Sequence, residues 1–107
     1  MATSALGRIP VVAGLAYVER VRRLPSSCAV TLAIEPGNRY FPHAIAVLAS
    51  GEKVGYVAPE IARAYYEPLK AYTGAVTCPA RRGTHADHET SGVELLLDFT
   101  ALPVTPE

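Results

Sequence analysis

The sequence predicts a single, mostly β domain that closes into a small barrel and carries one interposed helix. Two observations favour strands: short apolar segments recur between turn residues, and residues 92–100 alternate apolar and polar along their whole length. A helical spacing appears once, after Pro59. The chain of 107 residues has the size of one ordinary domain, so residues 1–107 are expected to fold as one unit.

Several segments are predicted to be strands because each is rich in apolar residues and most are bounded by Gly, Pro or Ser. They are residues 8–18, 28–35, 44–49, 53–57, 75–78 and 92–100. Gly14 inside the first segment is expected to mark a bend or bulge. In the second segment, alternation predicts that Val30 and Leu32 face the core. By the same alternation, Tyr56 shares a face with Val54 and is expected to be packed.

One helix is predicted to begin at Pro59, which suits the first turn, and Glu60 beside it suits a helix N-terminus. Its expected core-facing residues are Ile61, Ala62, Tyr65 and Leu69. Pro68 is expected to end or kink this helix near Tyr66 or Glu67. Residues 79–92, PARRGTHADHETSG, are predicted to be a polar loop, and residues 101–107 a fraying tail.

The charges are distributed unevenly, although the formal net charge is zero. Residues 1–82 hold ten Lys or Arg and five acids, whereas residues 83–107 hold five acids and no Lys or Arg. Two interpretations stay open: a basic face that attracts an anionic partner, or segments that interleave in the barrel and average the field. No apolar run approaches a membrane span or a signal peptide, so a cytoplasmic protein with reduced Cys28 and Cys78 is expected.

The sequence offers little for catalysis or metal binding. Clustered carboxylates for hard cations are lacking, since no Asp precedes Asp87. Cys78, His85 and His88 have a C-x6-H-x2-H spacing that matches no common zinc pattern. Nothing in the sequence brings Cys28, or the serines at residues 26–27, to His43 as a nucleophile and base. We therefore expect no enzyme activity, no metal and no cofactor.

Aromatic residues are a better indication of function. Tyr17, Tyr40, Phe41 and Tyr56 lie at predicted strand ends or beside turns, close in sequence to Arg39 and Lys53. Aromatic faces beside cations are typical of single-stranded nucleic-acid binding, with each stacked base contributing roughly 1–3 kcal/mol. The alternative is that these tyrosines are half-buried in the barrel wall with only the hydroxyl in water. The residues alone leave both open.

Residues 11–69 resemble the HIRAN domain family. The matching pieces are VAGLAY (residues 12–17), VTLAIEPGNRYFPHAIAVL (residues 30–48) and GEKVGYVAPEIARAYYEPL (residues 51–69). The resemblance implies a small OB-like or SH3-like β-barrel. It also implies a stand-alone or modular protein of DNA repair or replication that captures single-stranded DNA, and in the best understood members its 3′-hydroxyl end. By position, Tyr17, Asn38 and Tyr40 match the family's binding pattern, and Tyr56 occupies the aromatic or histidine place after Val-Gly.

Three departures from the family pattern concern the DNA end. Phe41 stands where the family usually has an Asp, and a phenyl ring cannot accept a hydrogen bond as a carboxylate does. Residues 16–18, Ala-Tyr-Val, replace an Arg-Tyr-Tyr-like run, and His43 replaces a frequent Asn. The fold is therefore expected to transfer better than the 3′-end specificity.

The resulting hypothesis is a non-catalytic module that binds single-stranded DNA or DNA 3′ ends, as a monomer or beside a larger DNA-processing protein, with no membrane contact. Its expected binding residues are Tyr17, Asn38, Arg39, Tyr40, Phe41, His43, Lys53, Tyr56, Arg81 and Arg82. Asn38 is also expected to bond its own turn. The alternative is a protein-interaction module that presents Tyr40 and Phe41 as hydrophobic anchors.

Overall fold

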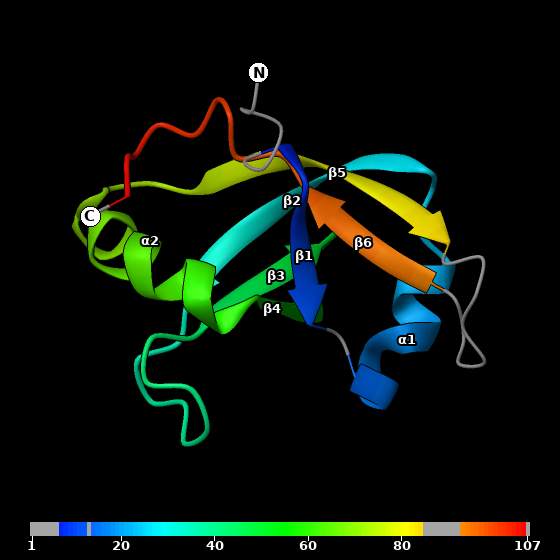
Figure 1. The fold of residues 1–107 in the computed structure, drawn as a ribbon, viewed down its shortest axis with the longest axis horizontal. Helices are drawn as coiled ribbons and strands as arrows, with labels where there is room; N and C mark the ends of the chain where they lie inside the picture. The colour runs from blue at the N-terminus through cyan, green and yellow to red at the C-terminus, as the bar shows by residue number, and fades with distance from the viewer. Residues whose placement is uncertain (1–6, 13, 85–92, 107) are drawn as a thin grey trace.

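The computed structural model describes residues 7–12, 14–84 and 93–106, which form a closed antiparallel barrel with two helices (Figure 1). The strands are β1 (Ile9–Val12), β2 (Ser27–Ile34), β3 (Ile45–Ala49), β4 (Glu52–Val57), β5 (Val76–Thr84) and β6 (Val93–Leu97). The helices are α1 (Gly14–Arg22) and α2 (Pro59–Ala71). Around the barrel the order is β1-β4-β3-β2-β5-β6, and β6 pairs with β1 to close it. The mostly β barrel expected from the sequence is confirmed.

The barrel interior is filled by alternate residues of the strands. Val30 and Leu32 of β2 are buried as expected, and Ile45, Val47 and Leu97 are essentially inaccessible to solvent. Burial of such side chains contributes roughly 1.5–3 kcal/mol each. The two helices lie at opposite ends of the barrel, α2 on the left of Figure 1 and α1 on the lower right. The core therefore lies between the strands, and the helices leave parts of the outer sheet face exposed.

The first predicted strand, residues 8–18, is correct only in its first part. β1 is four residues long, and Gly14 begins α1 rather than bending a strand. Tyr17 and Val21 are one helical turn apart; Val21 is buried and Tyr17 is partly buried, and α1 packs against β4 and β6. Apolar content alone cannot distinguish a strand from a buried helix. In this segment the spacing of Tyr17 and Val21, one helical turn apart, corresponds to the helix that forms.

Pro68 does not end α2, so that one of the two effects predicted for it, an end or a kink, is wrong. The helix runs to Ala71 because its apolar face continues past the proline: Tyr65, Tyr66 and Leu69 are all buried. A proline inside a helix removes one main-chain hydrogen bond, and burial of Leu69 holds the following turn in place. The predicted start at Pro59 is confirmed.

The predicted loop at residues 79–92 is wrong for its first part, because β5 extends to Thr84. Residues 79–84 read as polar since Pro79 and Arg81 lie on the outer face, whereas Cys78 and Ala80 are buried inside. β5 pairs with both β2 and β6, so these residues are a structural part of the barrel wall. The rest of the predicted loop, residues 85–92, lies outside the described residues.

The tail was expected to fray, but Leu102 and Val104 pack against the core. The Leu102 N–H donates to the Phe99 carbonyl over 3.4 Å, and Phe99 itself is buried against Tyr65 with ring centroids 5.0 Å apart. Two apolar residues within a proline-containing segment are therefore enough to anchor it. Both cysteines are free, as expected; burial raises the pKa of the Cys78 thiol to about 12, so it stays protonated.

Candidate nucleic-acid interface

Residues 35–44 form a loop between β2 and β3 that is closed by its own hydrogen bonds. The Glu35 N–H donates to the Ala44 carbonyl over 2.9 Å. The Asn38 side-chain oxygen accepts from the main-chain N–H groups of Tyr40 and Phe41, at 2.8 and 2.9 Å. Asn38 therefore organises the turn, as expected, and fixes where the two aromatic residues leave it.

An irregularity between β3 and β4 turns Tyr56 outward. Leu48 pairs with Lys53 and Val47 pairs with Gly55, so Val54 is an extra residue in β4. Gly55 has a φ of +152°, a backbone conformation that side-chain-bearing residues rarely adopt. Without the bulge, Tyr56 would share the inner face of Val54, as predicted. That prediction is wrong: Val54 is buried inside, and Tyr56 lies partly exposed on the outer face with Lys53.

A hydrogen-bond network connects the loop to β4 through Glu35, a residue that the sequence reasoning missed. The Glu35 carboxylate accepts from the Lys53 ammonium, from the Tyr56 hydroxyl at 2.9 Å and from the Asn38 amide at 3.1 Å. Burial acts to raise the pKa of Glu35, but these hydrogen bonds together lower it. The bonds to Glu35 and Tyr56 in turn raise the pKa of Lys53. The positive charge of Lys53 is thus offset inside the site.

Three aromatic rings from different elements meet at Tyr56. Phe41 of the loop lies 5.9 Å from the Tyr56 ring, centroid to centroid, and Tyr17 of α1 lies 6.5 Å from it in an edge-to-face arrangement. The Arg20 guanidinium lies 5.7 Å from the centre of the Tyr17 ring. Such contacts fix ring orientation and add about 0.5–1.5 kcal/mol each. Tyr17, Phe41 and Tyr56, all predicted site residues, are therefore brought together.

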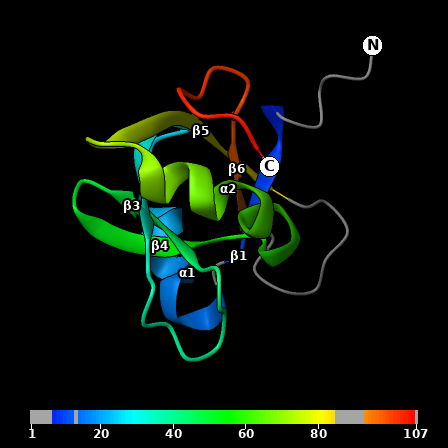
Figure 2. The same ribbon diagram turned by 90° about the vertical axis from the view of Figure 1, so that its left-hand side faces the viewer.

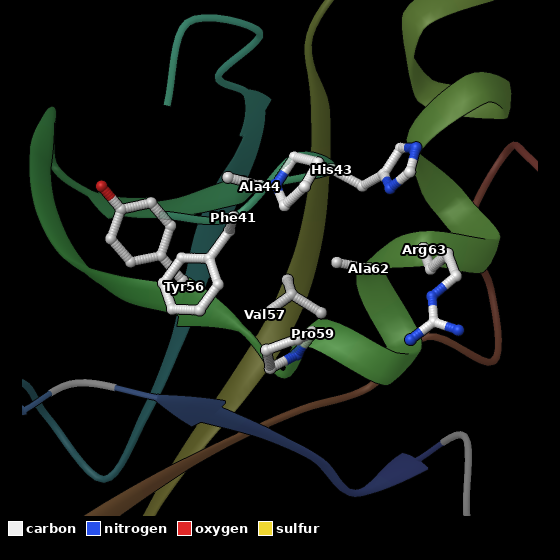
Figure 3. Close-up of a pocket in the computed structure, with 9 residues that line it drawn as sticks. Phe41, His43, Ala44, Tyr56, Val57, Pro59, Ala62 and Arg63 are labelled. Carbon is white, nitrogen blue, oxygen red and sulfur yellow. The ribbon is translucent and has the colours of Figure 1, made fainter. Parts of the chain in front are cut away.

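A cavity of about 300 Å³ opens beside this aromatic cluster. In Figure 3, the Phe41 and Tyr56 rings form one wall, and His43 and Arg63 stand on the opposite side. Val57 and Ala62 are among the apolar residues that line it, and the first turn of α2 borders it at Pro59. His43 is fixed edge-on against Tyr66, with ring centroids 5.2 Å apart. The cavity has an aromatic side and a basic side.

Arg63 is the functional candidate that sequence reasoning did not find. It lies about one helical turn after Pro59, at an exposed position of α2 beside the core-facing residues that the sequence pattern marks. Helical spacing from Ala62 would have placed it beside the buried face of α2, but no sequence signal indicates that this edge faces residues 41–44. The juxtaposition comes from the tertiary fold alone.

The remaining predicted residues do not join this cavity. Arg39 and Tyr40 are exposed on the loop, and Tyr40 is 80% exposed. Arg81 lines a separate cavity of about 190 Å³ with Cys28 and Asp98. Arg82 lies at the end of α1, where its Nη1 donates to the Arg22 carbonyl over 3.3 Å. The predicted phosphate-binding cations are therefore dispersed over three surfaces.

The described residues offer no alternative chemistry of the kinds considered from the sequence. Cys28 and His43 line different cavities, so they do not form a nucleophile and base pair. No group of three or more His, Cys, Asp or Glu suited to a metal ion occurs in the described part of the chain. Neither α1 nor α2 has the length and apolar character needed to cross a bilayer. The side chains at the cavity are suited to stacking and to attraction of an anion.

Comparison with known proteins identifies the family. A family model described as the HIRAN domain matches residues 7–97. This match includes β5 and β6, which the resemblance seen in residues 11–69 did not reach. No curated protein and no solved structure shows significant similarity to the chain.

Proposed function

The chain belongs to the HIRAN domain family, which is associated with DNA binding, and we propose that it binds single-stranded DNA without catalysing a reaction. The observation that carries the proposal is the cavity between the Phe41 and Tyr56 rings and the basic side chains of His43 and Arg63. At about 300 Å³ it has the size of the smallest ligand sites, so it accommodates one base with its sugar.

Each side of the cavity has a distinct role in this proposal. A base stacks on Phe41 and Tyr56, an interaction that tolerates any sequence because every base has a π-face. Arg63 attracts the adjoining phosphate as a permanent cation, and a ring N–H of His43 can donate a hydrogen bond to it. Tyr40 precedes Phe41 in the loop and is exposed, and we propose that its ring stacks on a further base. Asn38 acts indirectly by holding the turn.

Preference for a free 3′-hydroxyl is expected to be weak. The described residues that line the cavity include no carboxylate to accept a hydrogen bond from that group. Glu35 is near, but its oxygens already accept hydrogen bonds from Lys53, Tyr56 and Asn38. The protein is therefore proposed to hold single strands, including their ends, in repair or replication beside a larger DNA-processing protein.

The test is fluorescence anisotropy with short labelled single strands that end in a 3′-hydroxyl, a 3′-phosphate or a blocked 3′ position, at two salt concentrations. We expect similar affinity for the three ends, with log affinity falling with log salt at a slope of roughly −0.7 per neutralised phosphate. Strong preference for the hydroxyl would show that a carboxylate does reach the ligand. No binding at low salt would contradict the proposed function.

One observation keeps a protein-interaction role as second candidate: Tyr40 is 80% exposed at the tip of a hydrogen-bonded loop. Phe41, the other proposed anchor, faces the cavity and contacts Tyr56, so it is not presented outward. A partner that docks on Tyr40 would bind with little dependence on salt. The same anisotropy experiment, if negative for every strand, would favour this role.

A further inference from the structure

We propose that α1 and Arg82 form a second subsite, which binds the phosphates of a DNA strand where it leaves the cavity. The proposal rests on the proposed function, because the strand must first place a base against Phe41 and Tyr56. In this proposal Arg20 and Arg82 contact the phosphates. The sequence-based prediction named Arg39, Lys53, Arg81 and Arg82.

The subsite is continuous with the cavity through a chain of side-chain contacts. Tyr56 meets Tyr17 at 6.5 Å between ring centroids, and Arg20 lies over the Tyr17 ring. Arg82 follows at the end of α1, bonded to the carbonyl of Arg22. Figure 2 shows the loop of residues 35–44 and α1 on the same side of the barrel, the lower one in this view. Aromatic and basic side chains therefore run from the cavity across β4 to the end of α1.

Hydrogen bonds to main-chain carbonyls hold the guanidinium groups of Arg20 and Arg82 in place. Arg20 donates to the Lys53 carbonyl over 2.7 Å, and Arg82 donates to the Arg22 carbonyl. A carbonyl is neutral, so each guanidinium is oriented and keeps its full charge. Lys53 and Arg22, in contrast, are paired with Glu35 and Glu19. Among the side chains that the structure describes, neither Arg20 nor Arg82 forms a salt bridge. Pre-oriented, uncompensated guanidinium groups suit phosphate binding.

The length of the path from Phe41 to Arg82 determines how many nucleotides a strand needs to reach both ends. The ring-to-ring distances from Phe41 to Tyr56 and on to Tyr17, with the rise of helix from Tyr17 to Arg22, add to a path of at most roughly 20 Å. A stacked strand advances about 3.4 Å per nucleotide, so a strand of roughly six nucleotides is long enough to reach from the cavity to Arg82. A dinucleotide held in the cavity does not reach it.

Arg81 provides a matched control for Arg82. The two arginines are neighbours in β5, and each carries the same charge. Arg81 is exposed on the outer face beside Asp98, whereas Arg82 points to α1. Removal of either side chain changes the net charge equally, so a difference between Arg81→Gln and Arg82→Gln isolates the position of the charge from its amount.

The experiment measures the affinity of labelled thymidine oligonucleotides of two and eight nucleotides, as a function of salt, for the wild type and four variants. For the octanucleotide, we expect Arg82→Gln and Arg20→Gln each to weaken binding about five- to tenfold at low salt and to reduce the salt slope by roughly 0.7. Arg81→Gln should change affinity less than twofold. Dinucleotide affinity, measured by competition, should be unchanged in these three. Phe41→Ala should weaken both lengths.

The outcomes separate this proposal from the one on which it rests. If the wild type binds the octanucleotide but Arg81→Gln and Arg82→Gln weaken it equally, the attraction is diffuse and the subsite is overturned. If the octanucleotide binds no more tightly than the dinucleotide, the strand does not cross α1, which also overturns it. If neither length binds, the proposed function itself fails. Thermal unfolding of each variant identifies any loss of folding, and Arg20→Gln tests the subsite independently of Arg82.

Discussion

The Glu35–Lys53 network and the cavity beside it use charge in opposite ways, although they share the Tyr56 side chain. In the network, the ammonium, the carboxylate, the phenol and the Asn38 amide satisfy one another. Across the cavity, Arg63 has no acid within salt-bridge distance among the described residues. The first region holds the loop in place, and the second is able to attract a ligand. Closeness in sequence to an aromatic residue therefore does not show which cation is available to bind a ligand. Lys53 is close to Tyr56 in sequence but is paired with Glu35, whereas Arg63 is distant in sequence and lines the cavity.

The largest expected effect comes from the cavity wall. Phe41→Ala removes a stacking surface and should weaken binding of a short single strand by about tenfold or more, since each stacked base contributes roughly 1–3 kcal/mol. Anisotropy titration measures this directly. Phe41→Tyr is the control, because it keeps the ring and should retain most of the affinity. Unchanged binding in the alanine variant would show that the ligand lies elsewhere.

The next effect concerns stability. Glu35→Gln leaves Lys53 without its charged partner in a partly buried site, and we expect a loss of about 1–2 kcal/mol in the free energy of unfolding. For a domain of this size that corresponds to a fall in Tm of roughly 4–16 °C, measured by calorimetry at neutral pH. Glu67→Gln, at an exposed position of α2 away from its first turn, is the control. Equal Tm values for the two variants would mean that the network does not hold the loop.

The same network predicts a pH dependence. The pKa of Glu35 is lower in the folded protein than its ordinary value of about 4.3, so folding favours the ionised carboxylate. Its contribution is fully present above the ordinary pKa and is lost as the pH falls through the lower, folded value. Between pH 6 and pH 3, wild-type Tm should therefore fall more steeply than that of Glu35→Gln. Parallel curves would contradict the assignment.

A smaller effect on strand affinity is expected to distinguish Arg63, which has no acidic partner among the described residues, from Lys53, which is paired with Glu35. Arg63→Gln should weaken strand binding several-fold and reduce the salt slope by roughly 0.7, because a phosphate contact is lost. Lys53→Gln should leave the salt slope nearly unchanged, since the charge of Lys53 is offset by Glu35. Lys53→Gln should instead lower Tm in thermal unfolding, because the ion pair with Glu35 is lost. Identical salt slopes for the two variants would contradict the comparison.

The smallest expected effect is at the tip of the loop. Tyr40 is exposed and its side chain supports nothing in the described structure, so Tyr40→Ala should leave Tm within about 1–2 °C of the wild type. Strand affinity should fall about two- to fivefold if the ring stacks on the base next to the cavity. Unchanged affinity would make Tyr40 irrelevant to DNA, and its exposure would then favour the protein-interaction role.

The barrel was predictable from sequence because alternation and turn residues are local signals. The errors fall where a local signal is ambiguous. Gly14 could bend a strand or begin a helix, and Pro68 could end a helix that tertiary burial of Leu69 in fact maintains. Residues 79–84 suggested a loop because they include a proline, two arginines and a glycine, and Ala80, which is buried on the inner face of β5, is too small to reveal the alternation.

The candidate site was predictable in its aromatic part and in His43, which lines the cavity. Phe41 and Tyr17 lie in motifs that the family resemblance marks. Tyr56 points outward because of the bulge at Gly55. The bulge reverses which face of β4 the following residues occupy, and composition does not indicate that a bulge is present. Glu35 and Arg63 contribute through partners that are distant in sequence. Pairing of charges between distant segments is set by the fold, and it decides which cations stay available.

The most direct test of the central claim is an NMR titration of the ¹⁵N-labelled protein with a short single strand at low salt. If the cavity holds the base, the largest amide shifts should cluster at Phe41, Tyr56 and Arg63, with smaller shifts in α1. Saturating shifts confined to other surfaces, or no shifts at all, would contradict the proposal that the cavity between Phe41 and Arg63 binds single-stranded DNA.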